Sequence, residues 1–351
     1  MQNIKKYTER NNSSGYIFSN EIVFRGHPDK VCDQISGAIL DECLKQDPFT
    51  RAGIEVVGGK KKFFITGELT TKAKINFKQI TRRVLSDVGY DSKKYKIIVD
   101  ISKQSKDIAL GVDNDGAGDQ GIVYGYATNE TTKLLPLSMV ILKEFAFKYD
   151  CIRKMKPYAF YPDGKAQITG LYKNGKLVRI LSFVINYQNS EIWRDKTDKI
   201  ITTLAEMICK KYKIPVDEFI INNSGKFKIG GFDADSGLTG RKIVVDSYQG
   251  FARNGGGNMN GKDPTKIDLS AAHKARDLAK RFLKTYRLKW CEVQLSYVIG
   301  KPEPLSIYVN SNKGLIPVDD SILQECTPSR MIDDLKLREP LYEKRAAFGH
   351  F

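Results

Sequence analysis

The chain has 351 residues, of which 41% are hydrophobic and 28% charged, and it carries a formal net charge of +16. This balance is ordinary for a globular protein of two or three domains, and no run approaches the roughly eighteen apolar residues of a membrane-spanning helix. The lysines are spread along the chain without interleaved aromatic residues, which favours an electrostatic role toward a small polyanion over nucleic-acid binding.

Residues 1–15 are polar and lack the apolar stretch of a secretion signal, so they are interpreted as a flexible leader. The 6 cysteines lie far apart without a CxxC pair, which indicates a reduced, cytoplasmic protein. The three histidines, His27, His273 and His350, share no metal-ligand spacing. Any catalytic metal is therefore expected to be a hard, oxygen-liganded ion such as magnesium.

The first predicted elements are a helix and a hairpin. Apolar residues recur at helical spacing from Asp29, and Pro28 suits a first turn. Residues 51–57 and 61–71 alternate apolar and polar side chains on either side of a glycine pair, which predicts a β-hairpin. Glu55 points away from the apolar face of this hairpin, and Glu68 ends its second arm.

The rest of the chain interleaves helices with further strands. The AsnGly pair at 174–175 predicts a hairpin turn. Because hairpins outnumber βαβ crossovers, we expect an α+β fold with mainly antiparallel or mixed sheets. The predicted helices lie near 75–89, 136–149, 199–212 and 270–286, and the predicted strands near 95–102, 166–173, 176–185, 219–223, 241–248, 291–300 and 305–310.

Two glycine motifs resemble nucleotide-binding fingerprints without fitting them. "GAGDQG" at 116–121 matches GxGxxG, but the residues before it are too polar for a buried strand and those after it favour a strand over a helix. "GGGNMNGKDPTK" at 255–266 begins like a P-loop, yet Asp263 and Pro264 stand where a hydroxyl and a helix should follow. The next helix is predicted to begin near Ser270.

The chain nevertheless carries several short motifs suited to an anion. Successive glycines let the backbone approach a ligand closely, and two lysines follow them in the 255–266 motif. Basic and acidic residues also occur together in "GHPDK" (26–30), "PDGK" (162–165) and "GLTGRK" (237–242). Each motif alone could be a turn. Together they favour a polyphosphate site assembled from several loops, with acids available for magnesium.

Four of these motifs resemble, in this order, the methionine adenosyltransferase (S-adenosylmethionine synthase) family: "GHPDK", "GAGDQG" followed by "YGYATNE", "GLTGRKIVVD", and "GGG" followed by "GKDPTKID". The resemblance runs from about Glu21 to the final "AAFGHF". It implies that methionine sulfur attacks C5′ of ATP, and that the released triphosphate is hydrolysed to pyrophosphate and phosphate. ATP and L-methionine would be the substrates.

The same resemblance implies an architecture. Family members have three similar α+β domains with pseudo-threefold symmetry and helices on one face of each sheet. In this chain the boundaries would fall near 16–114, 115–229 and 230–351, and the domains could be discontinuous. Active sites would lie at the interface of a homodimer, which could pair further into a homotetramer, with no nucleic acid or membrane partner.

The resemblance also assigns roles to individual residues. The catalytic residues would be His27, which would assist departure of the triphosphate, with Lys165, Arg241 and Lys262. ATP would be bound by these four together with Asp119, Asp163, Phe227, Asp235 and Lys242. Methionine would be bound by Glu68, Gln104, Asp235 and Lys266. Two Mg²⁺ per site would be held by Asp29, Asp268 and Glu21, and K⁺ by Glu55.

Each assignment has an ordinary alternative. His27 could cap a helix, the acids could pair with a helix dipole or face solvent, the lysines could be solvated, and Phe227 could be a core residue. A kinase or P-loop ATPase would use ATP differently, and a catalytically silent relative acting as a regulatory partner would bind it without reaction.

The sequence departs from the family pattern at several positions. Arg25 stands where glutamate is usual, Asn258–Asn260 replace Ala-Phe-Ser, Leu269 replaces an arginine, and the usual proline and glycine are missing before Asp235. The segment after Gln104, a mobile gate in relatives, is short. Because the residues assigned to metal and phosphate are all present, we expect an active enzyme with altered kinetics.

Overall fold

The computed structural model of the chain describes residues 15–104 and 115–351. The expected leader, apart from Gly15, and most of the short segment after Gln104 lie outside these residues. Two compact units are present: unit 1 combines Met1–His27 with Glu130–Gly231, and unit 2 combines Pro28–Asn129 with Phe232–Phe351. No helix in the described part of the chain is long and apolar enough to span a bilayer.

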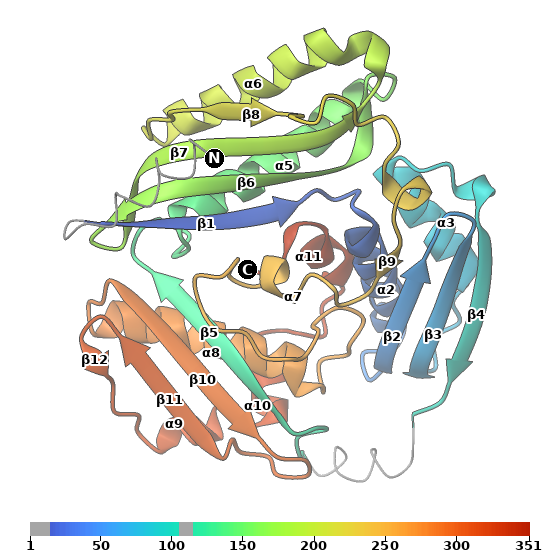
Figure 1. Cartoon of the computed structure of the whole chain (residues 1–351). Helices are drawn as coiled ribbons and strands as arrows, with labels where there is room; N and C mark the ends of the chain where they lie inside the picture. The colour runs from blue at the N-terminus through green and yellow to red at the C-terminus, as the bar shows by residue number, and fades with distance from the viewer. Residues whose placement is uncertain (1–14, 105–114) are drawn as a thin grey trace. The chain divides into compact units, whose positions relative to one another are not determined.

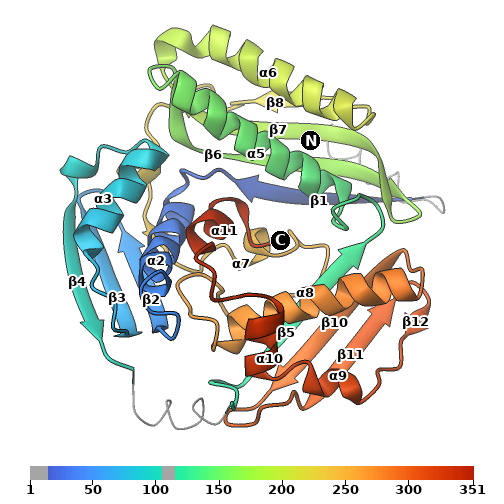
Figure 2. The same ribbon diagram turned by 180° about the vertical axis from the view of Figure 1, so that it is seen from behind.

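Unit 1 contains one four-stranded sheet in the order β1-β6-β7-β8. Its strands are β1 (Tyr16–Val23), β6 (Phe160–Lys173), β7 (Lys176–Asn189) and β8 (Phe219–Ile221). β8 is parallel to β7, and the other pairs are antiparallel. The helices α5 (Leu137–Met155) and α6 (Arg194–Lys211) pack against each other beside this sheet (Figure 2).

The long β6–β7 hairpin turns where the sequence predicts. Asn174 and Gly175 both have positive φ, 51° and 75°, as a two-residue hairpin turn with this twist requires. The strand pairing places Val23 of β1 opposite Lys165 of β6, and Glu21 opposite Gln167. The hairpin therefore fixes which face of the sheet carries the predicted site residues of this unit.

Unit 2 contains a mixed sheet in the order β4-β3-β2-β9 (Figure 1). Its strands are β2 (Arg51–Gly58), β3 (Lys62–Thr70), β4 (Lys96–Ser102) and β9 (Gly237–Leu238), and β4 is parallel to β3. The helices α2 (Pro28–Leu44) and α3 (Phe77–Val88) pack together beside it. Nearly every α2 side chain is buried, because β2 packs on one side and α11 (Tyr342–Phe348) on another.

The other sheet of unit 2 is antiparallel throughout, in the order β12-β11-β10-β5. Its strands are β5 (Gly121–Thr128), β10 (Trp290–Tyr297), β11 (Ser306–Ser311) and β12 (Gly314–Leu315). Helix α8 (Ile267–Thr285) packs on β5 and β10, and α10 (Pro328–Asp334) packs on α8. The short helices α7 (Ile243–Asp246) and α9 (Ser321–Gln324) complete the unit.

The three sheets share one connectivity. In each, a helix is followed by a hairpin: α2 by β2–β3, α5 by β6–β7, and α8 by β10–β11. A distant strand then adds to each hairpin, since β1 pairs with β6, β5 with β10, and β9 with β2. The chain thus consists of three similar α+β domains, each completed by a strand from far away in the sequence. Both the α+β class and the mixed sheets are as predicted.

Two local predictions are wrong. Residues 241–248 are not a strand, because α7 forms there instead: a single helical turn points Val245 and Asp246 inward, while Val244 stays 48% exposed. Tertiary contacts of Asp246 thus outweigh the β propensity of the run. Helix α8 begins at Ile267 rather than near Ser270, because the backbone restriction from Pro264 reaches only Asp263.

Candidate functional site

Two loops from late in the sequence cover the outer edge of β2, on the side opposite β3. The 237–242 loop pairs there through β9, and the Thr239 N–H donates to the Val56 carbonyl at 3.0 Å. The 255–266 loop pairs further along the same edge through a bridge between Gly53 and Lys262. Strand β2 therefore holds two of the predicted anion-binding motifs on one edge.

Asp263 fastens the second loop to this strand. Its Oδ2 accepts the Ala52 N–H at 2.8 Å, and its own N–H donates to the Ala52 carbonyl at 3.0 Å. The remaining carboxylate oxygen accepts the Thr265 N–H at 2.9 Å. The loop is thus built as a strand-edge bridge, which agrees with the prediction that it is not a P-loop opening directly into a helix.

The buried Asp29 side chain connects the start of α2 to the 237–242 loop. Its Oδ1 accepts the Leu238 N–H at 3.0 Å, and its Oδ2 accepts from Lys242 Nζ at 2.5 Å. Arg241 Nε lies 3.3 Å from Oδ1. The "GHPDK" and "GLTGRK" motifs consequently meet at one carboxylate.

A second acid–base pair lies on the 255–266 loop. Lys262 Nζ is 2.5 Å from Oδ2 of Asp268, in the first turn of α8, and both side chains are about one-fifth exposed, at 22% and 17%. A Cβ atom added to Gly257 would lie 2.0 Å from the Asp268 carboxylate. Glycine is therefore required at 257 so that the loop backbone can approach this acid.

Three of the four residues assigned to methionine lie together. Lys266 Nζ is 2.6 Å from Glu68 Oε1, and the Gln104 Nε2–H donates to the same oxygen at 3.2 Å. Asp235 does not join them: its exposed carboxylate accepts the N–H of Ser236 at 2.7 Å. The cluster presents a carboxylate beside an ammonium group, which complements the two charges of an amino acid.

Glu55 lies on β2 beside these pairs, and its neighbours Ile54 and Val56 are buried as predicted. Partial burial raises the pKa of Glu55, and the positive charge of Lys262 opposes this rise. Glu55 therefore faces the same cationic loop as Asp268. A partly desolvated carboxylate of this kind can attract a monovalent cation.

The carboxylates of the site fit a hard divalent cation by ligand type, since magnesium prefers carboxylate and phosphate oxygens. Among residues 15–104 and 115–351, however, no group of three or more His, Cys, Asp or Glu side chains forms a complete metal site. Asp29 and Asp268 are each bound to lysine instead. Phosphate oxygens would have to supply the remaining ligands.

Unit 1 brings together a separate set of predicted residues. A Cβ atom on Gly26 would lie 2.2 Å from the Pro162 carbonyl oxygen, so "GHPDK" and "PDGK" touch. The Phe24 N–H donates to the Gly164 carbonyl at 2.8 Å, which holds the chain before His27 beside the residue that precedes Lys165. Glu21 and Lys165 are exposed, and the register puts them on one face of the sheet as diagonal neighbours.

The other predicted residues have mixed environments. Asp163 is buried, and its Oδ2 accepts the Gly231 N–H at 2.8 Å. Phe227 is only half-buried, so it is not a core residue. Asp119 is exposed and accepts the Gln120 N–H at 2.8 Å.

The departures from the family pattern are accommodated locally. Arg25 Nη1 lies 3.5 Å from an Asp150 carboxylate oxygen, on α5 of the same unit, so its positive charge has an acidic partner. Leu269 is fully buried in α8. The asparagines 258 and 260 bond to each other, with the Asn258 Nδ2–H donating to the Asn260 carbonyl at 2.8 Å.

Sequence reasoning missed a buried polar network behind these loops. Lys30 is 1% exposed and forms ion pairs with Asp33, at 3.0 Å, and with Asp246. Asp33 also accepts the Gly240 N–H at 2.9 Å. The i,i+3 spacing of Lys30 and Asp33 was a usable signal, but nothing local pointed to Asp246.

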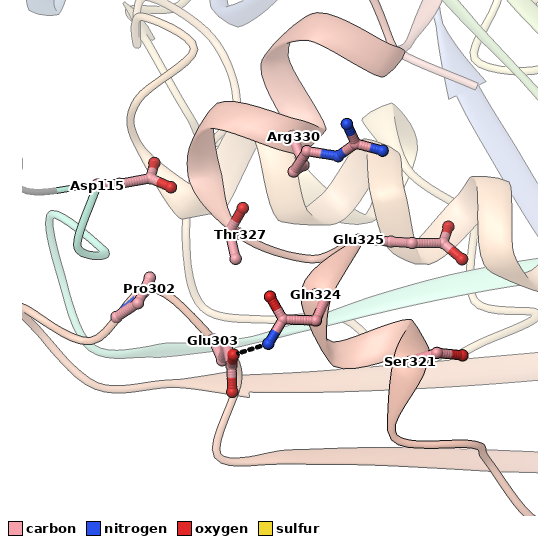
Figure 3. Close-up of a pocket in the computed structure, with 8 residues that line it drawn as sticks. All are labelled: Asp115, Pro302, Glu303, Ser321, Gln324, Glu325, Thr327 and Arg330. Atoms are coloured by element: carbon pink, nitrogen blue, oxygen red, sulfur yellow. Dashed lines mark hydrogen bonds between the residues drawn. The ribbon is translucent and has the colours of Figure 1, made fainter.

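A pocket elsewhere in unit 2 contains none of the predicted residues (Figure 3). It has a volume of about 550 Å³ and lies between the β10–β11 connection and the α9–α10 region. Its acids have partners: Glu303 accepts from Gln324, Glu325 accepts from Lys274 at 3.1 Å, and Asp115 accepts from Ser329. The paired lysines and acids along β2 are therefore the better candidate site.

Comparisons with known proteins identify the family of the chain. Three family models match in succession: the N-terminal domain of S-adenosylmethionine synthetase over residues 15–109, the central domain over 114–227, and the C-terminal domain over 229–351. The structure groups β1 and β5 with later hairpins, so the compact units do not follow these contiguous ranges.

Similar curated proteins cover almost the whole chain. It is 41% identical to an S-adenosylmethionine synthase of Brachyspira hyodysenteriae over 96% of this chain and 93% of the relative. The synthases of Trichormus variabilis and Mesoplasma florum are each 39% identical, over 96% and 95% of this chain and 92% and 94% of the relatives. These matches show that the chain belongs to the S-adenosylmethionine synthase family.

Proposed function

We propose that this protein is a methionine adenosyltransferase, which makes S-adenosylmethionine from ATP and L-methionine. One observation carries the proposal: two distant loops and the start of α2 place Lys242, Lys262 and Lys266 around β2, each bonded to a carboxylate. A leaving triphosphate needs several preorganised cations, and a set of lysines held by exchangeable acid partners provides them.

The proposed reaction requires little acid–base chemistry. The sulfur of methionine is a thioether and has no proton to lose, so its lone pair attacks C5′ of ATP directly while the C5′–oxygen bond breaks. The electrons of that bond leave with the triphosphate. Catalysis then depends on holding the sulfur in line with the bond and on stabilising the leaving charge. Hydrolysis of the triphosphate to pyrophosphate and phosphate would follow in the same site.

The triphosphate would replace the carboxylates as the partner of the basic side chains. Lys262 would turn from Asp268 to a phosphate oxygen, and Arg241 with Lys242 would do the same from Asp29. The freed carboxylates of Asp29 and Asp268, with Glu21, would hold two Mg²⁺, whose chemistry is to neutralise phosphate charge. The partly buried Glu55 would serve a K⁺ ion.

Methionine would be recognised as a zwitterion. Glu68 would accept from its ammonium group and Lys266 would donate to its carboxylate, so the substrate would replace the internal pair between these two side chains. Gln104, already bonded to Glu68, would orient that carboxylate. Asp235 is proposed as a further contact with both substrates.

For the predicted residues of unit 1 we propose the roles that the family resemblance implies. We propose that His27 lies beside the breaking C5′–oxygen bond, and that Lys165 and Asp163 contact the nucleotide. The half-buried ring of Phe227 leaves a face available for stacking on adenine. Asp119 is proposed to act from the partner subunit.

An assembly of two chains is part of the proposal, with active sites at the interface. Val57 and Phe64, paired across β2 and β3, are 42% and 36% exposed, and Ile122 on β5 is 48% exposed. Exposed apolar residues on sheet faces support a self-association surface. Pairs of dimers could form a tetramer, and the free thiols of the described cysteines support a cytoplasmic location.

Incubation with ATP, Mg²⁺ and labelled methionine tests the proposed function. We expect labelled S-adenosylmethionine with stoichiometric pyrophosphate and phosphate. Formation of ADP would instead indicate a kinase or ATPase. Binding of ATP without any product would indicate a catalytically silent relative.

A further inference from the structure

A chain of buried polar contacts runs from α2 to residues 349–351. Lys30 is ion-paired with one oxygen of Asp246, and the other oxygen, Oδ2, accepts the Nδ2–H of Asn260 at 2.7 Å. Asn260 is 3% exposed and lies two residues before Lys262. The 255–266 loop, which Asp263 fastens to β2, is therefore also tied to the interior of unit 2 through the Asn260 amide.

The carboxylate sets the direction of the remaining bonds. A carboxylate only accepts, so the Asn260 amino group faces Asp246, and its Oδ1 accepts from the ring of His350. The His350 Nε2–H is thus the donor, at 2.9 Å, and its Nδ1 can accept from Nε2–H of His273 at 3.4 Å. Burial lowers the pKa of His273 to about 3, and the charges of Arg345 and Lys280 add to this effect, so the ring is neutral.

The backbone and the next side chain hold His350 in place. Its N–H donates to the Asp246 carbonyl at 2.9 Å. The Phe351 ring stacks on Tyr248 with a centroid distance of 5.0 Å and an interplanar angle of 4°. Phe351 also lines a small cavity shared with Gly257 and Asp268. His350 thus bonds to the loop at Asn260, and Phe351 lines the same small cavity as Gly257 and as Asp268, the acid that pairs with Lys262.

The loop needs such support because of its composition. Glycines at 255–257 and 261 allow many backbone conformations, and fixing one of them costs entropy. Asp263 anchors the loop after Lys262, through Ala52. Before Lys262, the Asn260 side chain is held from two sides by His350 and Asp246, and Asn254 accepts from Ser247 at the start of the loop.

We propose that His350 and Phe351 are positioning residues for ATP: they hold the 255–262 loop in the conformation in which Lys262 meets the triphosphate. This inference rests on the proposed function of that loop. Neither residue contacts the reacting atoms, and both act through Asn260 and the Asp268 side of the cavity.

Titration calorimetry of the full chain with Mg·ATP, without methionine, tests the inference. In His350→Leu the donor to Asn260 is lost, and ATP should bind about tenfold more weakly, as expected for one buried hydrogen bond. Phe351→Ala should weaken binding in the same direction. In His350→Gln the side-chain amide can donate to Asn260 again, so affinity should recover to within about threefold of the parent protein.

Tyr297→Phe is the matched control for a structural effect. It removes a buried hydroxyl in the same unit, which donates to the Cys326 carbonyl at 2.7 Å and contacts Met331, neither of which belongs to the loop. Its ATP affinity should be unchanged even if its melting temperature falls. Equal weakening in this control, or parental affinity in His350→Leu, would overturn the positioning role.

The product assay separates this inference from the proposed function. If the parent protein forms S-adenosylmethionine but His350→Leu binds ATP normally, the positioning role fails and the function stands. If ATP binding depends on His350 but no S-adenosylmethionine forms, the function fails and the positioning role stands. A parent protein that does not bind Mg·ATP contradicts both.

Discussion

Lys262 and Asp268 form an ion pair 2.5 Å long between the glycine loop and the first turn of α8. Each is about one-fifth exposed, so a ligand can reach both groups. The pair can stabilise the loop when no ligand is bound. With ATP bound, Lys262 would bind phosphate and Asp268 would bind Mg²⁺. Lys262 is therefore not simply a solvated surface lysine. It is paired with an acid in the first turn of α8, and the loop backbone can approach that acid only because residue 257 is glycine.

Lys262→Ala should lower kcat/KM for ATP at least about 10²-fold, because a preorganised charge that faces the leaving group is lost. Steady-state synthesis and triphosphate hydrolysis both report this. Lys280→Ala is the control and should retain parental rates. Lys280 lies on α8, its side chain is 40% exposed, and its one described salt bridge is with Asp277. Unchanged synthesis and hydrolysis in Lys262→Ala would show that the lysine is merely solvated.

Glu68→Gln should act on methionine rather than ATP. The variant keeps an oxygen for Gln104 but loses the charge that would attract the substrate ammonium, so KM for methionine should rise about tenfold or more. KM for ATP should stay within about twofold. Glu206→Gln, an exposed position on α6, is the control for an added glutamine. A rise in both KM values would indicate that Glu68 supports the loop as a whole.

How far the sequence predicts this protein depends on how local each signal is. Three elements were predictable: the α2 helix, the β2–β3 hairpin and the turn at Asn174. Helix-capping residues, alternating apolar and polar residues, and turn residues are all signals carried by neighbouring positions in the sequence. The threefold recurrence was not, because each hairpin takes its third strand from elsewhere in the chain.

The site shows the same division. The residue types in the four motifs indicated phosphate chemistry, and resemblance to a family supplied their roles. Their pairing was not predictable: nothing near Lys266 indicates Glu68, which is 198 positions away. Asp246 shows the limit most clearly, since the apolar run around it favours a strand, whereas in the structure it lies in a helical turn and bonds to Lys30 and Asn260.

His27→Ala should reduce kcat about 10²-fold, as for the loss of one donor to a developing charge in a transition state. The residue lies between β1 and α2, and its N–H is bonded to the Phe24 carbonyl at 3.0 Å, a contact that alanine keeps. The melting temperature should therefore change little. Near-normal turnover would contradict the catalytic role, whereas a large loss of stability would support a helix-capping one.

The pair of His273, which is partly exposed, and His350, which is buried, predicts a pH dependence of stability. The pKa of His273 is lowered from 6.5 to about 3, so the folded protein keeps this ring neutral while the unfolded chain binds a proton below about pH 6.5. The unfolded state then holds more protons, and the stability contributed by the neutral ring is intact above pH 6.5 and is lost progressively as the pH falls toward 3. Since His273 is partly exposed, we expect this residue to account for about 1 kcal/mol between pH 7.5 and pH 5.5.

Urea unfolding of the parent protein and His273→Gln at these two pH values measures that contribution. Glutamine can still donate to His350 but does not titrate, so the variant should lose about 1 kcal/mol less than the parent on acidification. The comparison cancels the contributions of the carboxylates and the other histidines to the free energy of unfolding, because these groups titrate in both proteins. If both lose the same stability, the His273 ring is protonated in the folded state at pH 5.5, and the lowered pKa of His273 is wrong. A smaller loss in the variant would instead show that the folded protein keeps the His273 ring neutral at pH 5.5.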